Sequence, residues 1–92
     1  MRHARAEALA DLEPLLSELR ARDALKERTP GSFYYKSRGF LHFHEDPAGL
    51  FADLKVGDAF QRFEVTQPPQ RQHLLDLVDA LLTPTTTTTR PA

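Results

Sequence analysis

The sequence predicts a two-layer α+β domain: a four-stranded antiparallel meander with N-terminal and C-terminal helices packed on one face. Apolar residues recur at helical spacing near both ends of the chain, whereas the middle alternates apolar with polar residues. Three turn signals divide that middle into four segments. A chain of 92 residues has room for one small hydrophobic core, so we expect a single domain over residues 1–82.

The first expected element is helical over residues 5–28. From Leu9 onward, leucines recur at steps of three or four, with acidic and basic residues on the other side. Pro14 interrupts the pattern, because an interior proline removes a helical hydrogen bond and clashes with the preceding turn. We therefore expect a short helix followed by a main helix that begins near Glu13. The helix breakers at 29–32 end this region.

The central segment, residues 33–66, has no helical period and contains three turn signals. The stretch 37–39 resembles a three-residue hairpin loop that ends in glycine. The stretch 46–49 is a four-residue loop with proline and glycine, and 57–58 suits a two-residue turn. The strands expected between these turns are residues 33–36, 40–45, 50–56 and 59–65.

The turn lengths decide which side chains share a face, because side chains alternate along a strand. The first turn pairs Tyr35 with Leu41 and Phe33 with Phe43. The same alternation, followed through the second and third turns, places one set of mostly apolar side chains toward the helices. Gln61 is the polar exception. This set is Phe33, Tyr35, Leu41, Phe43, Leu50, Ala52, Leu54, Val56, Phe63 and Val65. Three turns agree on one apolar face, which is the main support for the fold.

The opposite side of the sheet is the predicted binding face. It comprises Tyr34, Lys36, Phe40, His42, His44, Phe51, Asp53, Lys55, Phe60, Arg62 and Glu64. The same counting lines up one row across all four strands: Tyr34, His42, Asp53 and Arg62. Three phenylalanine rings on a face without helices favour an interface, so we expect a non-catalytic binding or self-assembling module. A homodimer is the simplest assembly, although the rings can also lie over lysine and arginine stems in a monomer.

The last expected element is a helix that starts near 66–69, with proline in its first turn, and runs to about Leu82. Leu74, Leu77 and Val78 belong to its apolar stripe. Threonine and proline dominate residues 83–92 and cannot bury enough apolar surface to offset the ordering of the chain. We expect a flexible tail there.

Composition excludes several classes of function. The 12 lysines and arginines nearly balance the 13 aspartates and glutamates, so no global charge favours nucleic acid or an anionic membrane. The absence of cysteine excludes disulfides, thiolate nucleophiles and cysteine-bound zinc. No apolar run reaches the ~18 residues of a membrane span, and acidic residues interrupt the N-terminal segment where a secretory signal would be apolar. We expect a cytoplasmic protein.

His42 and His44 offer an alternative, a small metal- or histidine-dependent enzyme. Imidazoles two residues apart on a strand project from the same side and can share a metal, with Asp46, Asp53 or Glu64 as a further ligand. The spacing leaves this ligand set incomplete, so we expect neither metal nor cofactor. His42 opposite Asp53 also resembles an acid–base pair, but no nucleophile accompanies it, and cross-strand charge pairing explains the same pattern.

Nucleic-acid binding is the second alternative for the same face. Some four-stranded domains stack bases on aromatic residues that are interleaved with basic ones. Asp53, Glu64 and Glu45 oppose this interpretation because they place negative charge on the face.

The string FYYKSRGFLHFHEDPAGLFADL, residues 33–54, resembles small bacterial proteins built from a helix, a β-meander and a closing helix. The resemblance implies an α+β fold and no particular activity. The order of elements also resembles frataxin-like domains, which is a likeness of fold that implies nothing about iron.

Overall fold

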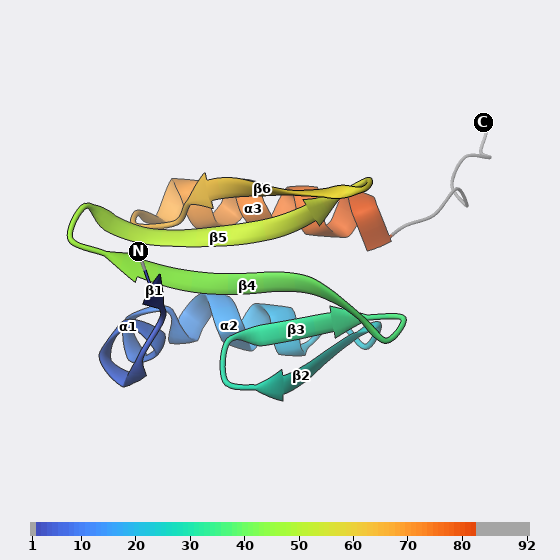
Figure 1. Cartoon of the computed structure of the whole chain (residues 1–92), viewed down its shortest axis with the longest axis horizontal. Helices are drawn as coiled ribbons and strands as arrows, with labels where there is room; N and C mark the ends of the chain where they lie inside the picture. The colour runs from blue at the N-terminus through green and yellow to red at the C-terminus, as the bar shows by residue number, and fades with distance from the viewer. Residues whose placement is uncertain (1, 83–92) are drawn as a thin grey trace.

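The computed structural model describes residues 2–82 and shows an α+β fold with an antiparallel sheet (Figure 1). The elements are β1 (Arg2–His3), α1 (Ala6–Asp11), α2 (Glu13–Arg20), β2 (Leu25–Thr29), β3 (Ser32–Tyr35), β4 (Arg38–Asp46), β5 (Gly49–Val56), β6 (Ala59–Glu64) and α3 (Pro68–Leu82). The tail predicted at 83–92 lies outside the described residues. No helix within residues 2–82 has both the length and the apolar character needed to cross a membrane.

The sheet has six strands, so the predicted count of four was wrong. Its order is β2-β3-β4-β5-β6, and β1 pairs separately with β4. The four predicted strands appear as β3 to β6, with ends within two residues of the prediction. β1 joins the edge of β4 beyond β3, where His3 lies opposite His44. Arg5 holds this junction in place, because its backbone N–H and its Nε donate to Glu45 Oε2 at 2.9 and 3.1 Å.

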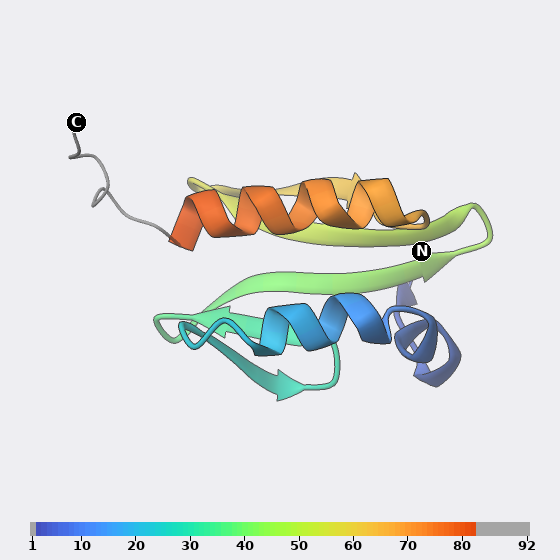
Figure 2. The same ribbon diagram turned by 180° about the vertical axis from the view of Figure 1, so that it is seen from behind.

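The helices α2 and α3 lie over the same face of the sheet (Figure 2), whereas α1 lies beside β1 at one end. Arg22, just after α2, donates to both carboxylate oxygens of Asp79 in α3, at 2.8 and 2.9 Å. Arg71 in α3 donates to the carbonyl oxygen of Asp11 at 3.1 Å. Charged side chains therefore bridge the helices, and apolar side chains fill the space between helices and sheet. The largest fully buried ones are Phe33, Phe43, Leu12, Leu16, Leu19, Leu41, Leu54, Leu74, Val65 and Val78.

The predicted helix break is confirmed, but the predicted end of the helical region is wrong. Pro14 lies in the first turn of α2, where a missing N–H leaves no helical bond unmade. The helix ends at Arg20, and residues 25–29 form β2 instead. Leu25 is buried and Lys26 is exposed, which is the two-residue alternation of a strand. The breakers at 29–32 then form the β2–β3 turn, in which Gly31 has a φ of 79°.

The first predicted hairpin has the wrong register. Its turn is Lys36-Ser37, and both residues have positive φ, 54° and 68°. Such a turn suits a tight two-residue hairpin, although glycine and asparagine usually occupy these positions. Phe33 pairs with Leu41 rather than with Phe43, and the register shifts at the next position of β3. The three-residue loop at 37–39 is therefore not formed.

This shift is a β-bulge that redirects Phe40. Tyr34 pairs with Gly39 and Phe33 with Leu41, so Phe40 is an extra residue on β4. Its side chain belongs to the hydrophobic core and is only 6% exposed, contrary to the prediction that it lies on the binding face. The ring meets that of Tyr35 edge-on at 5.4 Å. A bulge thus buries both Phe40 and its neighbour Leu41.

The other two hairpins have the predicted register. Leu41 lies opposite Leu54, and Phe43 lies opposite Ala52. On the next strand, Ala52 faces Phe63, and the β5–β6 turn brings Val56 to Ala59. The apolar face predicted for β4 to β6 is therefore the face that packs against the helices.

The different burial of Phe40 and Phe60 predicts different stability effects. Replacing Phe40 with alanine should lower the free energy of unfolding by about 3–5 kcal/mol, because it leaves a cavity in the core. Phe60 is 44% exposed, so Phe60→Ala should cost less than about 1 kcal/mol. Urea denaturation of both variants measures the difference. Equal and small losses would show that Phe40 is not a core residue.

Candidate functional site

The open face, defined as the side of the sheet away from α2 and α3, carries most of the predicted binding residues. They are Tyr34, His42, His44, Phe51, Asp53, Lys55, Phe60, Arg62 and Glu64. Strand pairing adds His3 opposite His44, and Lys26 opposite Tyr34. Phe40 has left this face for the core, and Lys36 lies in the β3–β4 turn.

Asp53 occupies the middle of the open face and has two partners, Arg62 and His44. Arg62 donates to it in a bidentate arrangement, Nε to Oδ1 at 2.8 Å and Nη2 to Oδ2 at 2.9 Å. His44 Nε2 lies 3.0 Å from Oδ2. The hydrogen bonds from Arg62 hold the pKa of Asp53 below its usual range; burial opposes this shift and the charge of His44 adds to it. The carboxylate is 17% exposed and remains ionised.

The predicted row of four residues is formed only in part. His42, Asp53 and Arg62 do lie opposite one another on successive strands. Tyr34 does not join them, because the Lys36-Ser37 turn pairs it with Gly39, and Ser32 lies opposite His42. The histidine that contacts Asp53 is His44 and not His42. His44 reaches the carboxylate diagonally, since residues two positions apart across a strand pair remain within reach of long side chains.

His42 packs against an aromatic ring instead. Its imidazole stacks on Phe60 with ring centres 5.2 Å apart and an angle of 27° between planes. Burial lowers the pKa of His42; the nearby charges of His44 and His3 lower it further, and the charge of Asp53 opposes them. The neutral ring is therefore favoured in the folded state. Its contribution to stability is complete above the ordinary histidine pKa of about 6.5 and is lost as the pH falls through the lower, folded-state pKa.

Aromatic rings and cations alternate over the rest of the open face. The Arg28 guanidinium lies 4.9 Å from the centre of the Tyr34 ring, and the Lys55 ammonium lies 5.9 Å from that of Phe60. Phe60 is the one large apolar side chain within residues 2–82 that is exposed. The open face is therefore a charged surface with rings set in it, rather than a continuous apolar patch.

The charged groups in the middle of this face form one cluster across β4, β5 and β6. Within residues 2–82, no group of three or more histidines, aspartates and glutamates is placed to hold a metal ion. His44 and Asp53 form an imidazole–carboxylate pair, but the pair lies on an open surface that does not exclude water. Arg62 also engages both carboxylate oxygens. An ion pair that fixes side-chain positions across three strands is the simplest description of this cluster.

Two contributors to the open face were missed because β2 was predicted to be helical. Lys26 and Arg28 lie beside Tyr34, and the segment LKERT has one apolar residue, so it carries no alternation that could have revealed them. His3 belongs to a strand of two residues, for which no sequence pattern exists.

In comparisons with known proteins, no protein-family model, no curated protein and no solved structure matches the sequence.

The electrostatic contact between Asp53 and His42 can be tested by titration. Asp53→Asn removes a negative charge that favours protonated His42, so the pKa of His42 should fall further below its ordinary value. NMR titration of the imidazole C–H signals measures this pKa. Asp58→Asn, in the β5–β6 turn, is the matched control and should leave it unchanged. An unaltered His42 pKa in Asp53→Asn would show that the two groups are not coupled.

Proposed function

We propose that this protein is a non-catalytic binding module that associates with a second copy of itself through the open face of its sheet. The observation that carries the proposal is the position of Phe60, exposed on the face that α2 and α3 leave uncovered. Phe51 and Tyr34 lie half-buried on the same face. Rings of this kind supply much of the binding energy at protein interfaces.

The distribution of charge along the strands favours a second copy as the partner. Lys55 and Phe60 pair near the β5–β6 turn, whereas Phe51 and Glu64 pair near the opposite end of the same strands. A two-fold axis that crosses the strands reverses their direction, so it brings the end with Lys55 over the end with Glu64. The face is thus complementary to itself in charge. It also presents Phe60 of one copy to Phe51 of the other.

The fixed cluster at the centre also suits an interface. Asp53 already forms a bidentate ion pair with Arg62 and a contact with His44, so covering it does not leave an unpaired carboxylate. Tying these side chains down before association lowers the entropy cost of forming the interface. The central part of the face is therefore prepared for burial.

Nucleic-acid binding on the same face is the second candidate. The observation that favours it is the pairing of cations with rings, Arg28 on Tyr34 and Lys55 on Phe60. Glu64 opposes it, because this carboxylate would lie against the phosphate backbone. The His44–Asp53 pair is the feature of the described face that recommends an enzyme, and it lies on an open strand surface.

Sedimentation equilibrium of the whole chain tests the proposal. From about 10 µM to about 1 mM, the mean mass should rise from monomer toward dimer, as expected for a modest interface. Phe60→Asp should weaken association at least tenfold, because it places a charge in the interface. Gln61→Asp is the matched control: it adds the same charge to the other side of β6 and should associate like the wild type.

A strict monomer over this range would contradict self-association. Tight binding of a single-stranded oligonucleotide, weakened by Phe60→Asp and by salt, would favour the second candidate instead.

A further inference from the structure

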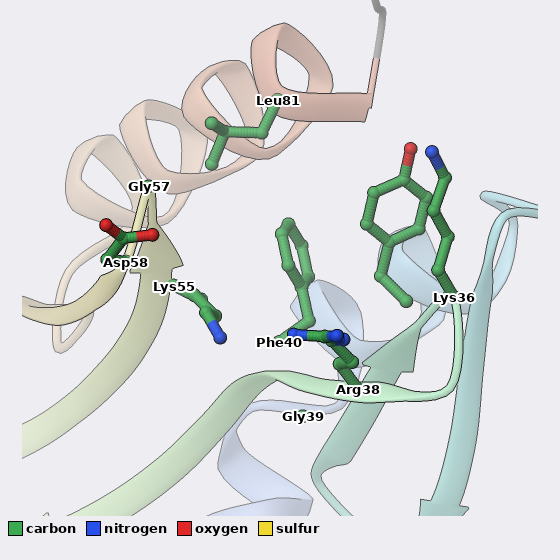
Figure 3. Close-up of a pocket in the computed structure, with 9 residues that line it drawn as sticks. Lys36, Arg38, Gly39, Phe40, Lys55, Gly57, Asp58 and Leu81 are labelled. Atoms are coloured by element: carbon green, nitrogen blue, oxygen red, sulfur yellow. The ribbon is translucent and has the colours of Figure 1, made fainter.

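A cleft lies at the end of the sheet where β4 begins and β5 ends (Figure 3). The last residues that join these strands are Leu41 and Leu54, although β4 starts at Arg38 and β5 continues to Val56. The strands therefore part at this end, as their ribbons do in Figure 1. A volume of about 350 Å³ lies between them, bounded by the last turns of α3.

The inner wall of the cleft is apolar, and the bulge in β4 is the cause. Because Phe40 is the extra residue, its side chain turns to the helix side and rises toward the part of α3 that carries Leu81 (Figure 3). Tyr35 stands next to it, with its ring edge-on to Phe40. The rings of Phe40 and Tyr35 and the side chain of Leu81 thus line the cleft at the point where β4 and β5 no longer pair.

The rim of the cleft is cationic. Lys36 comes from the β3–β4 turn, Arg38 from the start of β4 and Lys55 from the end of β5, while Asp58 is the one acidic residue in the lining. Within residues 2–82, none of these three cations forms a salt bridge, whereas Arg20, Arg22 and Arg62 each pair with carboxylates. The Lys36 ammonium lies over the Tyr35 ring at 5.2 Å. Unpaired cations around a concave apolar surface create a positive potential that attracts anions.

The β3–β4 turn fixes the position of Lys36 at the rim. Lys36 and Ser37 both have the left-handed backbone that residues with a side chain disfavour. A two-residue hairpin turn of type I′ requires this backbone at both positions. Here the turn holds a lysine at the mouth of the cleft.

We propose that the cleft binds a small organic anion, a phosphate group carried on a flat apolar ring. Arg38 can donate two parallel hydrogen bonds to the phosphate, and Lys36 and Lys55 add point charges. The ring occupies the wall formed by Phe40, Tyr35 and Leu81. The volume lies at the small end of the usual range for ligand pockets, about 300–1,000 Å³, and suits a molecule built on one ring system. The apolar wall of this site is separate from the association surface, since Phe40 and Leu81 lie outside the open face, and Lys55 belongs to both sites.

Phenyl phosphate is a suitable probe because it combines one ring with one phosphate. Titration followed by amide NMR should shift the signals of Gly39, Gly57 and Leu81, which line the cleft. Phenol and inorganic phosphate, each offering half of the contacts, should bind at least tenfold more weakly. Added salt should weaken the binding of phenyl phosphate, because the rim charges are near the surface.

Two double variants make the test specific. Lys36→Gln with Arg38→Gln removes two cations from the rim, both outside the open face, and should weaken binding of phenyl phosphate at least tenfold. Lys26→Gln with Arg28→Gln removes the same charge from the open face, away from the cleft, and should bind like the wild type. Equal losses in both variants would show non-specific attraction and overturn the proposal. Phosphate binding as tight as phenyl phosphate, or no shifts in the cleft signals, would also overturn it.

Discussion

The alternation of side chains along paired strands determines this structure, and one interruption of it determines the surfaces. On β4, alternation sends Leu41 and Phe43 toward the helices, and His42 and His44 to the open face. The bulge at Phe40 adds one residue and reverses the direction of the side chains that precede it. One extra residue therefore buries the Phe40 ring beside Leu41 and accompanies the separation of the start of β4 from β5, while the Lys36-Ser37 turn moves Tyr34 out of the row of His42, Asp53 and Arg62.

The two proposed sites follow from this geometry and share a boundary. Without Phe40, the open face keeps Phe60 as its exposed ring, and charged groups surround it. Lys55 marks the boundary, because its ammonium lies over the Phe60 ring and its side chain also lines the cleft. The Asp53–Arg62 pair keeps the middle of the face neutral, whereas the rim of the cleft keeps an excess of positive charge. The face suits a partner with mixed charges, and the cleft suits an anion.

The sequence predicted those parts of the fold that depend on strong local signals. Pro14 ended one helix, the turn at 46–49 aligned His42 with Asp53, and the turn at 57–58 aligned Asp53 with Arg62. The first hairpin failed because its turn consists of Lys36 and Ser37, two residues that rarely adopt positive φ, while the nearby Gly39 offered a more usual loop. β2 has one buried side chain in five residues, and tertiary pairing decided its structure against a weak helical pattern. The cleft could not be predicted, because it exists only where the bulge separates two strands.

The most direct test of the central claim is a solution measurement of the β3–β4 register. Nuclear Overhauser contacts between backbone protons should join Phe33 to Leu41, and the Phe40 ring should show contacts to Tyr35 and to the last turns of α3. Contacts that join Phe33 to Phe43 instead, together with a Phe40 ring exposed to water, would contradict the bulge. In that case all three hairpins from β3 to β6 would be free of bulges. Phe40 would then lie on the open face, and the cleft would lose its apolar wall.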